Sequence, residues 1–288
     1  MNKRPNTDPS QIKEYLETGI FDYFKIYELK KDQIDFYECH AAYAQELIKI
    51  YYYSVDKPKF DLICKKFIES YILSESEVEN VVDPLERAGL AAVYENTILK
   101  FVPDNLLNIH MLLLIRQMLY SKCPHPEAGG IYRSEEDGAE VHLSDFNVKL
   151  APAKDVIPLI NGLYPQSIEL FERGKRLGLE KDPADIIEYI GDCVKFNCQI
   201  IKIYPFLDGN KRTSRALMNL MFKTANIPPV FVTPKENPPY RRALEKALKD
   251  EDYDDIICFY YYKILESIWQ LDIKPKMDAN LNNINKAR

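Results

Sequence analysis

The residue types best suited to chemistry in this chain cluster in one short segment, residues 204–215, which reads Tyr-Pro-Phe-Leu-Asp-Gly-Asn-Lys-Arg-Thr-Ser-Arg. It contains one carboxylate, Asp208, and three cationic side chains, those of Lys211, Arg212 and Arg215. Gly209 and Asn210 tolerate positive φ, so a turn at this pair can aim several backbone N–H groups at one point. Cations and amides attract phosphate oxygens, and a carboxylate beside them can hold a divalent cation. The segment therefore predicts a polyphosphate cradle with a metal ligand at its edge.

Two core helices must position this segment. After it, apolar residues recur at spacings of one, three and four, which predicts a helix to about residue 226. Arg212 and Arg215 are three residues apart and lie on one face of that helix. Before it, the stretch from Asp182-Pro183 to residue 203 is apolar on most sides and predicts a buried helix. A loop held at both ends by core helices suits a preorganised phosphate site.

The segment resembles the signature of the Fic (Fido) family, H-P-F-x-[D/E]-G-N-[G/K]-R-x-x-R. Every position from Pro205 to Arg215 fits, while Tyr204 stands where the family carries its histidine. The resemblance implies an all-α (mainly helical) Fic/Fido fold with a small β-hairpin flap. It also implies a protein adenylyltransferase-like activity, in which AMP moves from ATP to a protein hydroxyl and the histidine is the general base. The lysine form of the loop also occurs in kinase-like relatives, so the transferred group stays open.

The resemblance assigns roles within the segment. It makes Tyr204, Asp208, Asn210 and Arg212 the catalytic residues and Asp208 the Mg²⁺ ligand. It implies that ATP is held by the turn and the cations that follow, namely Gly209, Asn210, Lys211, Arg212 and Arg215. Tyr240, which follows two paired prolines, is a candidate for lining the adenine pocket.

A second resemblance lies upstream, where Ser74–Asn80 is similar to the family's inhibitory motif, [S/T]-x-x-x-E-[G/N]. Glu79 and Asn80 match, whereas Glu75 occupies the Ser/Thr position. The resemblance implies that Glu79 pairs with Arg215 and displaces the γ-phosphate. A solvated acidic helix face is the alternative interpretation of this glutamate-rich window.

The stretch from Gly130 to Val148 is similar to the family flap that clamps the target protein, so we expect a target to dock along residues 130–148. Any surface hairpin would give the same pattern. His142 falls in this stretch and is a candidate substitute base, with a solvated flap residue as the alternative.

Loss of the histidine leaves three hypotheses open. The first is an AMP transferase with weakened or altered catalysis, because a phenol has an ordinary pKa near 10 and only about one in a thousand is ionised at pH 7. The second is a catalytically inactive pseudoenzyme that regulates by binding nucleotide or protein. The third is a de-AMPylating enzyme in which Glu79 orients a water.

The composition limits which kinds of binding partner we expect. The 288 residues carry a formal net charge of −6, which argues against nucleic acid or an anionic membrane as the main partner. No apolar run reaches the length of a membrane span. The six cysteines form no Cys-x-x-Cys pair, so we expect a reduced cytoplasmic protein, with secretion as an effector left open. A homodimer is compatible with the sequence.

Helical periodicity dominates the rest of the chain. We expect a disordered N-terminus at residues 1–9, a helical extension with the inhibitory segment at 10–99, the Fic domain at 100–273 and a polar tail at 274–288. Helices are predicted at about 10–18, 31–52, 57–74, 83–100, from 103, from 154, and at 237–249 and 253–271. The many tyrosines and phenylalanines are predicted to pack in the core, and not to form stacking platforms for bases.

Overall fold

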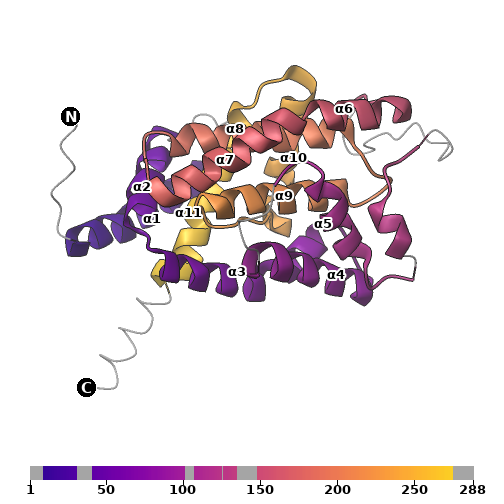
Figure 1. Cartoon of the computed structure of the whole chain (residues 1–288). Helices are drawn as coiled ribbons and strands as arrows, with labels where there is room; N and C mark the ends of the chain where they lie inside the picture. The colour runs from indigo at the N-terminus through magenta and orange to yellow at the C-terminus, as the bar shows by residue number, and fades with distance from the viewer. Residues whose placement is uncertain (1–8, 31–40, 101–106, 125, 135–147, 275–288) are drawn as a thin grey trace.

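A computed structural model describes residues 9–30, 41–100, 107–124, 126–134 and 148–274, and all the structural observations below concern these residues. They are mainly helical and include no β-strand (Figure 1). The all-α part of the predicted fold is therefore confirmed.

Eleven α-helices make up most of the described residues: α1 (Pro9–Lys30), α2 (Ala41–Ser54), α3 (Lys57–Val78), α4 (Pro84–Tyr94), α5 (Met111–Tyr120), α6 (Val156–Gly162), α7 (Tyr164–Glu180), α8 (Ile186–Ile203), α9 (Asn210–Thr224), α10 (Asn237–Asp250) and α11 (Asp254–Ile268). Two π-helical turns extend α4 and α11, at Glu95–Leu99 and Trp269–Ile273, and 3₁₀ turns lie at Pro126–Gly130, Ala153–Asp155 and Pro234–Glu236.

Helix α9 lies at the centre of the molecule and packs against α5, α7 and α8 (Figure 1). Its apolar residues are buried, and so are most of its polar ones. Helix α8 is also buried along most of its length. The two helices are joined by the short loop 204–209, which is consequently anchored at both ends in the core, as the sequence predicts.

The N-terminal helices pack against this centre. Helices α3 and α4 lie in a row along one edge of the molecule in Figure 1, and α4 packs on α5. Helix α2 packs on α11 and α8, and α1 packs on α2. The division of the chain into an extension and a Fic domain at residue 100 remains a prediction, because these helices share contacts across that boundary.

Three predicted helix boundaries are wrong. Helix α1 continues to Lys30, well beyond residue 18, and α3 runs through the acidic window to Val78 instead of ending at residue 74. The acidic window stays helical because its inward-facing glutamates have cationic partners, described below. The helix predicted from residue 103 begins only at Met111 within the described residues. The preceding residue, His110, donates its backbone N–H to the Asn108 side chain at 2.9 Å, and the two residues lie in a turn before the helix.

The predicted β-hairpin flap is not supported. Residues 131–134 and 148–150 have no regular secondary structure, and residues 135–147, including His142, lie outside the described residues. A physical reason is visible at Arg133, whose backbone N–H donates to the carbonyl of Pro205 at 3.0 Å, so it is used by the loop after α8 and not by a neighbouring strand.

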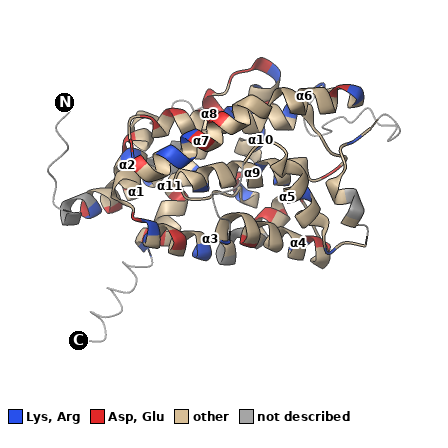
Figure 2. Ribbon diagram, in the orientation of Figure 1, with Lys and Arg blue, Asp and Glu red and all other residues tan. Residues whose placement is uncertain are grey.

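Most of the described aromatic residues pack in the core, as predicted, whereas Tyr15, Phe21 and Tyr53 are exposed. Tyr51, Tyr52 and the run Phe259–Tyr262 are buried. The five described cysteines are all free thiols. Lys and Arg alternate with Asp and Glu along the helices (Figure 2). Among the described residues, no helix is both long and apolar enough to cross a bilayer.

Candidate functional site

The loop between α8 and α9 begins and ends with a left-handed residue. Tyr204 caps α8 with φ 54° and donates its N–H to the carbonyl of Ile200 at 3.0 Å. Gly209 precedes α9 with φ 74°. A Cβ at Gly209 would lie 2.9 Å from the Tyr120 hydroxyl and 3.1 Å from Nη1 of Arg116. Both the backbone conformation and the close contact therefore demand glycine at this position.

Asn210 fixes the loop to the first turn of α9. Its Oδ1 accepts the N–H of Phe206 at 2.8 Å, and its Nδ2 donates to the carbonyl of the same residue at 2.7 Å. The side chain is buried and both of its polar atoms are used. In this arrangement, Asn210 shapes the loop through its side chain. The backbone N–H groups at the start of α9 are the donors that could bind an anion.

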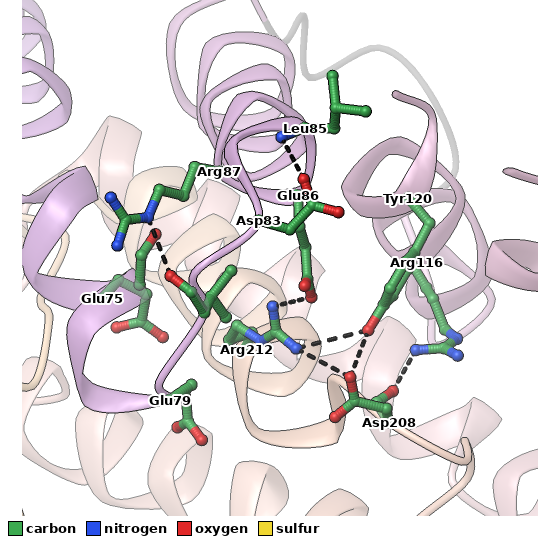
Figure 3. Close-up of polar contacts among 12 residues, drawn as sticks. Glu75, Glu79, Asp83, Leu85, Glu86, Arg87, Arg116, Tyr120, Asp208 and Arg212 are labelled. Atoms are coloured by element: carbon green, nitrogen blue, oxygen red, sulfur yellow. Dashed lines mark hydrogen bonds and ion pairs between the residues drawn. The ribbon is translucent and has the colours of Figure 1, made fainter. Parts of the chain in front are cut away.

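Arg212 joins three segments of the chain (Figure 3). It forms an ion pair with Glu86 of α4, and its Nη2 lies 3.2 Å from Oδ2 of Asp208 and 3.4 Å from the Tyr120 hydroxyl. Asp83 caps α4 by accepting the N–H of Leu85 at 2.8 Å, which fixes the first turn that carries Glu86. The guanidinium of Arg212 is thus buried among acceptors from α4, α5 and the loop.

Arg215 is fully buried and is bound by two carboxylates. Its Nε donates to Oε1 of Glu75 at 2.7 Å, its Nη2 donates to Glu75 and to Oε1 of Glu79 at 2.7 Å, and its Nη1 donates to the Tyr240 hydroxyl at 3.3 Å. The second oxygen of Glu79 pairs with Lys211 at 2.9 Å. The expected pairing of Glu79 with Arg215 is confirmed as a contact.

The end of α3 aims both glutamates at this arginine. Asn80 adopts φ 53°, its N–H donates to the carbonyl of Glu77, and the N–H of Val81 donates to that of Ser76 at 2.9 Å. These are the two hydrogen bonds of a Schellman C-cap, which Asn accommodates well. Glu75 and Glu79, one helical turn apart, face inward, whereas Glu77 is exposed. The solvated-face interpretation is therefore wrong for Glu75 and Glu79.

The two carboxylates differ in their electrostatics. Burial alone would raise the pKa of Glu79, but the charges of Arg215 and Lys211 prevail and lower this pKa to about 2. For Glu75 burial prevails, and it raises the pKa above its ordinary value despite the attraction of Arg215. The physical difference is that Glu79 has two cationic partners and Glu75 has one, in a fully buried position.

Asp208 is the one acid of the loop that faces solvent, with a side chain 71% exposed. Its Oδ2 accepts the Tyr120 hydroxyl at 2.9 Å, and its backbone carbonyl accepts from Arg116. The Arg116 guanidinium is sandwiched between the rings of Tyr120 and Phe206, 4.6 Å from each centroid. Within the described part of the chain, no group of three or more His, Cys, Asp or Glu side chains could hold a metal ion.

Tyr240 lies at the start of α10 with its hydroxyl on Arg215. The side chain is buried, and its ring packs against Phe259 and Tyr260. In this arrangement Tyr240 supports the arginine from the side opposite α3, and its predicted role in an adenine pocket stays a prediction.

The start of the expected flap is tied, through Arg133, to the end of α8 and the loop that follows it. The Arg133 side chain is buried and donates from Nε to the carbonyl of Tyr204 at 2.6 Å and from Nη2 to that of Ile203 at 3.1 Å. With its backbone bond to Pro205, this arginine holds three consecutive carbonyls of the loop. It fixes Tyr204 through the backbone.

Sequence reasoning missed four residues of the site: Glu75, Glu86, Arg116 and Tyr120. Two signals were present. Glu75 lies four residues before Glu79, so a helix through the acidic window puts both on one face. Arg116 and Tyr120 are likewise four apart on α5. Only the fold brings Glu86, in the first turn of α4, to Arg212.

Comparison with known proteins identifies the family. The Fic/DOC family model matches residues 104–222. The chain is 27% identical over 176 residues to the protein adenylyltransferase Fic of Nematostella vectensis, an alignment that covers 61% of this chain and 35% of the relative. It is 41% identical over 49 residues to the protein of the same name from Drosophila grimshawi, which covers 17% of this chain and 10% of the relative. The chain thus spans about a third or less of these curated relatives.

Solved structures share the fold. Fic-1 of C. elegans (aa134–508) superimposes with a TM-score of 0.51 at 17% identity, over 93% of this chain and 74% of that one. A Fic-domain-containing signalling protein of Bacteroides thetaiotaomicron gives a TM-score of 0.55 at 10% identity, over 78% of this chain and 93% of that one. At these identities the likeness concerns the fold. Together with this fold, the family model shows a Fic/DOC family domain at residues 104–222 of the chain.

Proposed function

We propose that this chain is a Fic-like protein nucleotidyltransferase that moves AMP from ATP to a hydroxyl of a target protein, with weakened catalysis because Tyr204 stands at the position of the family's base. The names of the curated relatives, protein adenylyltransferase, support this reaction class. The geometry of the site supports the nucleotide as substrate.

One observation carries the proposal. Three cations of α9 converge at the end of the loop, and each is bound by a carboxylate from the α3–α4 segment: Arg215 by Glu75 and Glu79, Lys211 by Glu79, and Arg212 by Glu86. Carboxylate and phosphate oxygens bind guanidinium in the same planar fork geometry. The carboxylates therefore stand where the phosphates of a nucleotide would bind, and the segment Glu79-Asn80 is an inhibitory element on this proposal.

The Mg²⁺ that this chemistry needs would be held by Asp208. A Mg²⁺ ion is usually bound by one or two carboxylates together with substrate phosphates, and an exposed single carboxylate beside the cations fits that pattern. Such an ion neutralises charge on the phosphates as they react. Tyr120, Arg116 and Arg212 orient Asp208 through its side chain and backbone.

The protein substrate would dock along residues 130–148. Arg133, at the start of this stretch, donates four hydrogen bonds, three of them to the carbonyls of Ile203, Tyr204 and Pro205 and one to that of Ala151. A target held there would lie beside Tyr204 and the start of α9. The partners are a nucleotide and a target protein.

A second function, that of a pseudoenzyme, is favoured by the same contacts. In the described arrangement Lys211, Arg212 and Arg215 are already paired, and position 204 carries a phenol. A pseudoenzyme of this kind would regulate by binding a nucleotide or a protein without catalysing a reaction. De-AMPylation, the third hypothesis, asks Glu79 to orient a water, which an ionised carboxylate can do by accepting a hydrogen bond.

A variant that lacks the carboxylates of Glu75 and Glu79 allows these functions to be tested. In the variant Glu75→Ser/Glu79→Gly we expect saturable binding of MgATP by calorimetry. Adding Arg215→Ala to this variant removes the arginine without stranding a buried carboxylate, and we expect it to abolish binding. Absence of MgATP binding in the doubly substituted chain contradicts the proposed function.

Adding Tyr204→His to the same variant separates the weak enzyme from the pseudoenzyme. A positioned general base contributes on the order of 10² to 10⁴ in rate. We expect transfer of label from α-labelled ATP to proteins of a lysate to rise by that order and to be lost with Asp208→Ala. Release of AMP from labelled protein, dependent on Glu79, would instead support the third hypothesis.

A further inference from the structure

The second arginine of the loop, Arg215, has almost no donor left for a ligand. A guanidinium has five N–H groups. Four of those of Arg215 are used: Nε and one N–H of Nη2 by Glu75, the other of Nη2 by Glu79, and one of Nη1 by Tyr240. A phosphate can bind here only after a carboxylate has been displaced.

Glu75 holds the edge of Arg215 that Glu79 does not reach. Its Oε1 accepts from both Nε and Nη2, and both residues have fully buried side chains. Glu79 contacts Nη2 alone and shares its charge with Lys211. Removing the Glu79 side chain therefore leaves Arg215 bonded through Nε and Nη2, with its charge still neutralised.

The residue type at position 75 makes this contact strong. The family's inhibitory motif has Ser or Thr there, and a hydroxyl does not carry charge. A carboxylate does, and a charge-assisted hydrogen bond is roughly twice as strong as a neutral one. Burial strengthens the pair further, because both side chains are fully buried and a low local dielectric increases the attraction between them.

We propose that Glu75 is a second inhibitory carboxylate, which keeps Arg215 from nucleotide phosphates even when the Glu79 carboxylate has been removed. The inference rests on the proposed function, because it concerns binding at the same phosphate site. It has a structural consequence. Glu75 and Glu79 are one turn apart on α3 and precede the same C-cap at Asn80, so nucleotide entry requires the last turns of α3 to withdraw together.

Calorimetric titration of the full chain with MgATP tests the proposal in five forms: unchanged, Glu79→Gly, Glu75→Ser, both substitutions together, and Glu77→Ser. The last is a matched control, because Glu77 belongs to the same helix but is exposed. Hydrogen bonds to charged groups contribute about 1.5–3 kcal/mol, which corresponds to roughly tenfold or more in affinity. We expect the double variant to bind MgATP at least about tenfold more tightly than Glu79→Gly. Glu77→Ser should bind like the unchanged chain.

Each outcome decides the question. Equal affinity of Glu79→Gly and the double variant would overturn the role of Glu75 while leaving nucleotide binding intact. Equal affinity of Glu75→Ser and the double variant would show that Glu75 alone inhibits binding, and it would overturn the proposal that both carboxylates do so. If the double variant binds no MgATP, the proposed function fails and the inference falls with it.

A folding control keeps the test valid. Thermal unfolding of each variant shows whether it retains a cooperative transition. Should Glu75→Ser fail to fold, Glu75→Gln replaces it, since glutamine keeps the shape of the side chain and removes the charge. The same order of affinities is expected, and equal binding by Glu79→Gly and Glu75→Gln/Glu79→Gly overturns the proposal.

Discussion

Glu75 and Glu79 hold the same guanidinium, but their surroundings shift their pKa values in opposite directions. Burial raises the pKa of Glu75, whereas Arg215 and Lys211 lower that of Glu79 to about 2. A shifted pKa makes the free energy of unfolding depend on pH. The pair therefore offers an internal comparison between two carboxylates at one site.

The first prediction concerns the pH dependence of stability. The folded protein binds a proton at Glu75 more readily than the unfolded chain, so this residue's contribution to stability is largest at low pH and falls as pH rises above about 4.5. Glu79 behaves oppositely, because its contribution is complete above about pH 4.5 and is lost as pH falls towards 2. Denaturant unfolding from pH 3 to 8 measures both.

The comparison uses Glu75→Gln and Glu79→Gln, which do not titrate. We expect the stability of the unchanged chain relative to Glu75→Gln to decrease from pH 4.5 upward. Relative to Glu79→Gln it should be constant above pH 5 and decrease below about pH 4.5. Parallel curves for the two variants would show that the two environments are alike.

The second prediction concerns Tyr120, whose hydroxyl donates to Asp208 at 2.9 Å. Tyr120→Phe removes this donor and keeps the ring that packs on Arg116. A hydrogen bond of this kind contributes about 0.5–1.5 kcal/mol. In the Glu75→Ser/Glu79→Gly chain, we expect MgATP affinity to fall by roughly two- to tenfold in calorimetry. Tyr120→Leu, which also removes the aromatic face, should lose more; an unchanged affinity in Tyr120→Phe would show that Asp208 needs no help from this side chain.

At the scale of elements, the C-cap of α3 decides where Glu79 lies. Asn80 is left-handed, and its cap bonds tie it to the preceding turn. Our third prediction is that Asn80→Ala lowers the free energy of unfolding by about 1 kcal/mol, because a Cβ without a polar group is disfavoured in this conformation. Asn80→Gly should be close to neutral.

Urea unfolding of the two Asn80 variants provides the measurement. Asn226 gives a control, since it is also left-handed, at φ 58°, but lies far along the chain after α9. Asn226→Ala should cost more stability than Asn80→Ala, because the Asn226 side chain also donates to the carbonyl of Gly178 at 2.9 Å, whereas only Asn80→Ala should increase MgATP binding. Equal stability of the Ala and Gly variants at position 80 would contradict the cap.

How far each element could be predicted depended on its apolar pattern. Helices α9, α10 and α11 have regular apolar faces and clear flanking prolines or acids, and the predicted bounds agree to within a few residues. Helix α3 was cut short because Glu75 and Glu79 interrupt its apolar face. No local pattern says that such glutamates are inside, since their partner Arg215 lies 140 and 136 residues away.

The candidate site divides in the same way. The loop and its cations could be read from residues 204–215, because a contiguous signature specifies them. Glu79 was found through a second, weaker motif. Glu86 and Tyr120 carry no signature, and only the packing of α4 on α5 and of α5 on α9 brings them to Arg212. At Tyr204 the sequence shows that the side chain differs from the family's histidine, but it does not show the catalytic consequence of that difference.

At the scale of the whole molecule, the α3–α4 segment closes the proposed phosphate site from one side. It supplies acids to the three cations near the start of α9, Lys211, Arg212 and Arg215. Figure 3 shows Glu86 reaching Arg212 from above, while Asp208 contacts it from the loop. Arg87 ties the start of α4 to the carbonyl of Val81 at 2.9 Å, so α4 is fixed to the end of α3. The two helices therefore respond together when the site opens.

The fourth prediction follows from this closure. A ligand that binds only the folded protein stabilises it by about 2.7 kcal/mol at a concentration one hundred times its Kd. For a chain of this size such a gain raises Tm by roughly 5 °C or more. We expect MgATP to raise the Tm of Glu75→Ser/Glu79→Gly by this amount and to leave that of the unchanged chain nearly constant, because binding there must first displace the buried Glu75 and Glu79. Glu77→Ser, which removes an exposed carboxylate of the same helix, should behave like the unchanged chain. An equal rise in Tm for the unchanged chain and the double variant would mean that nucleotide enters without displacing α3, and the phosphate site would then have to be open in the native protein.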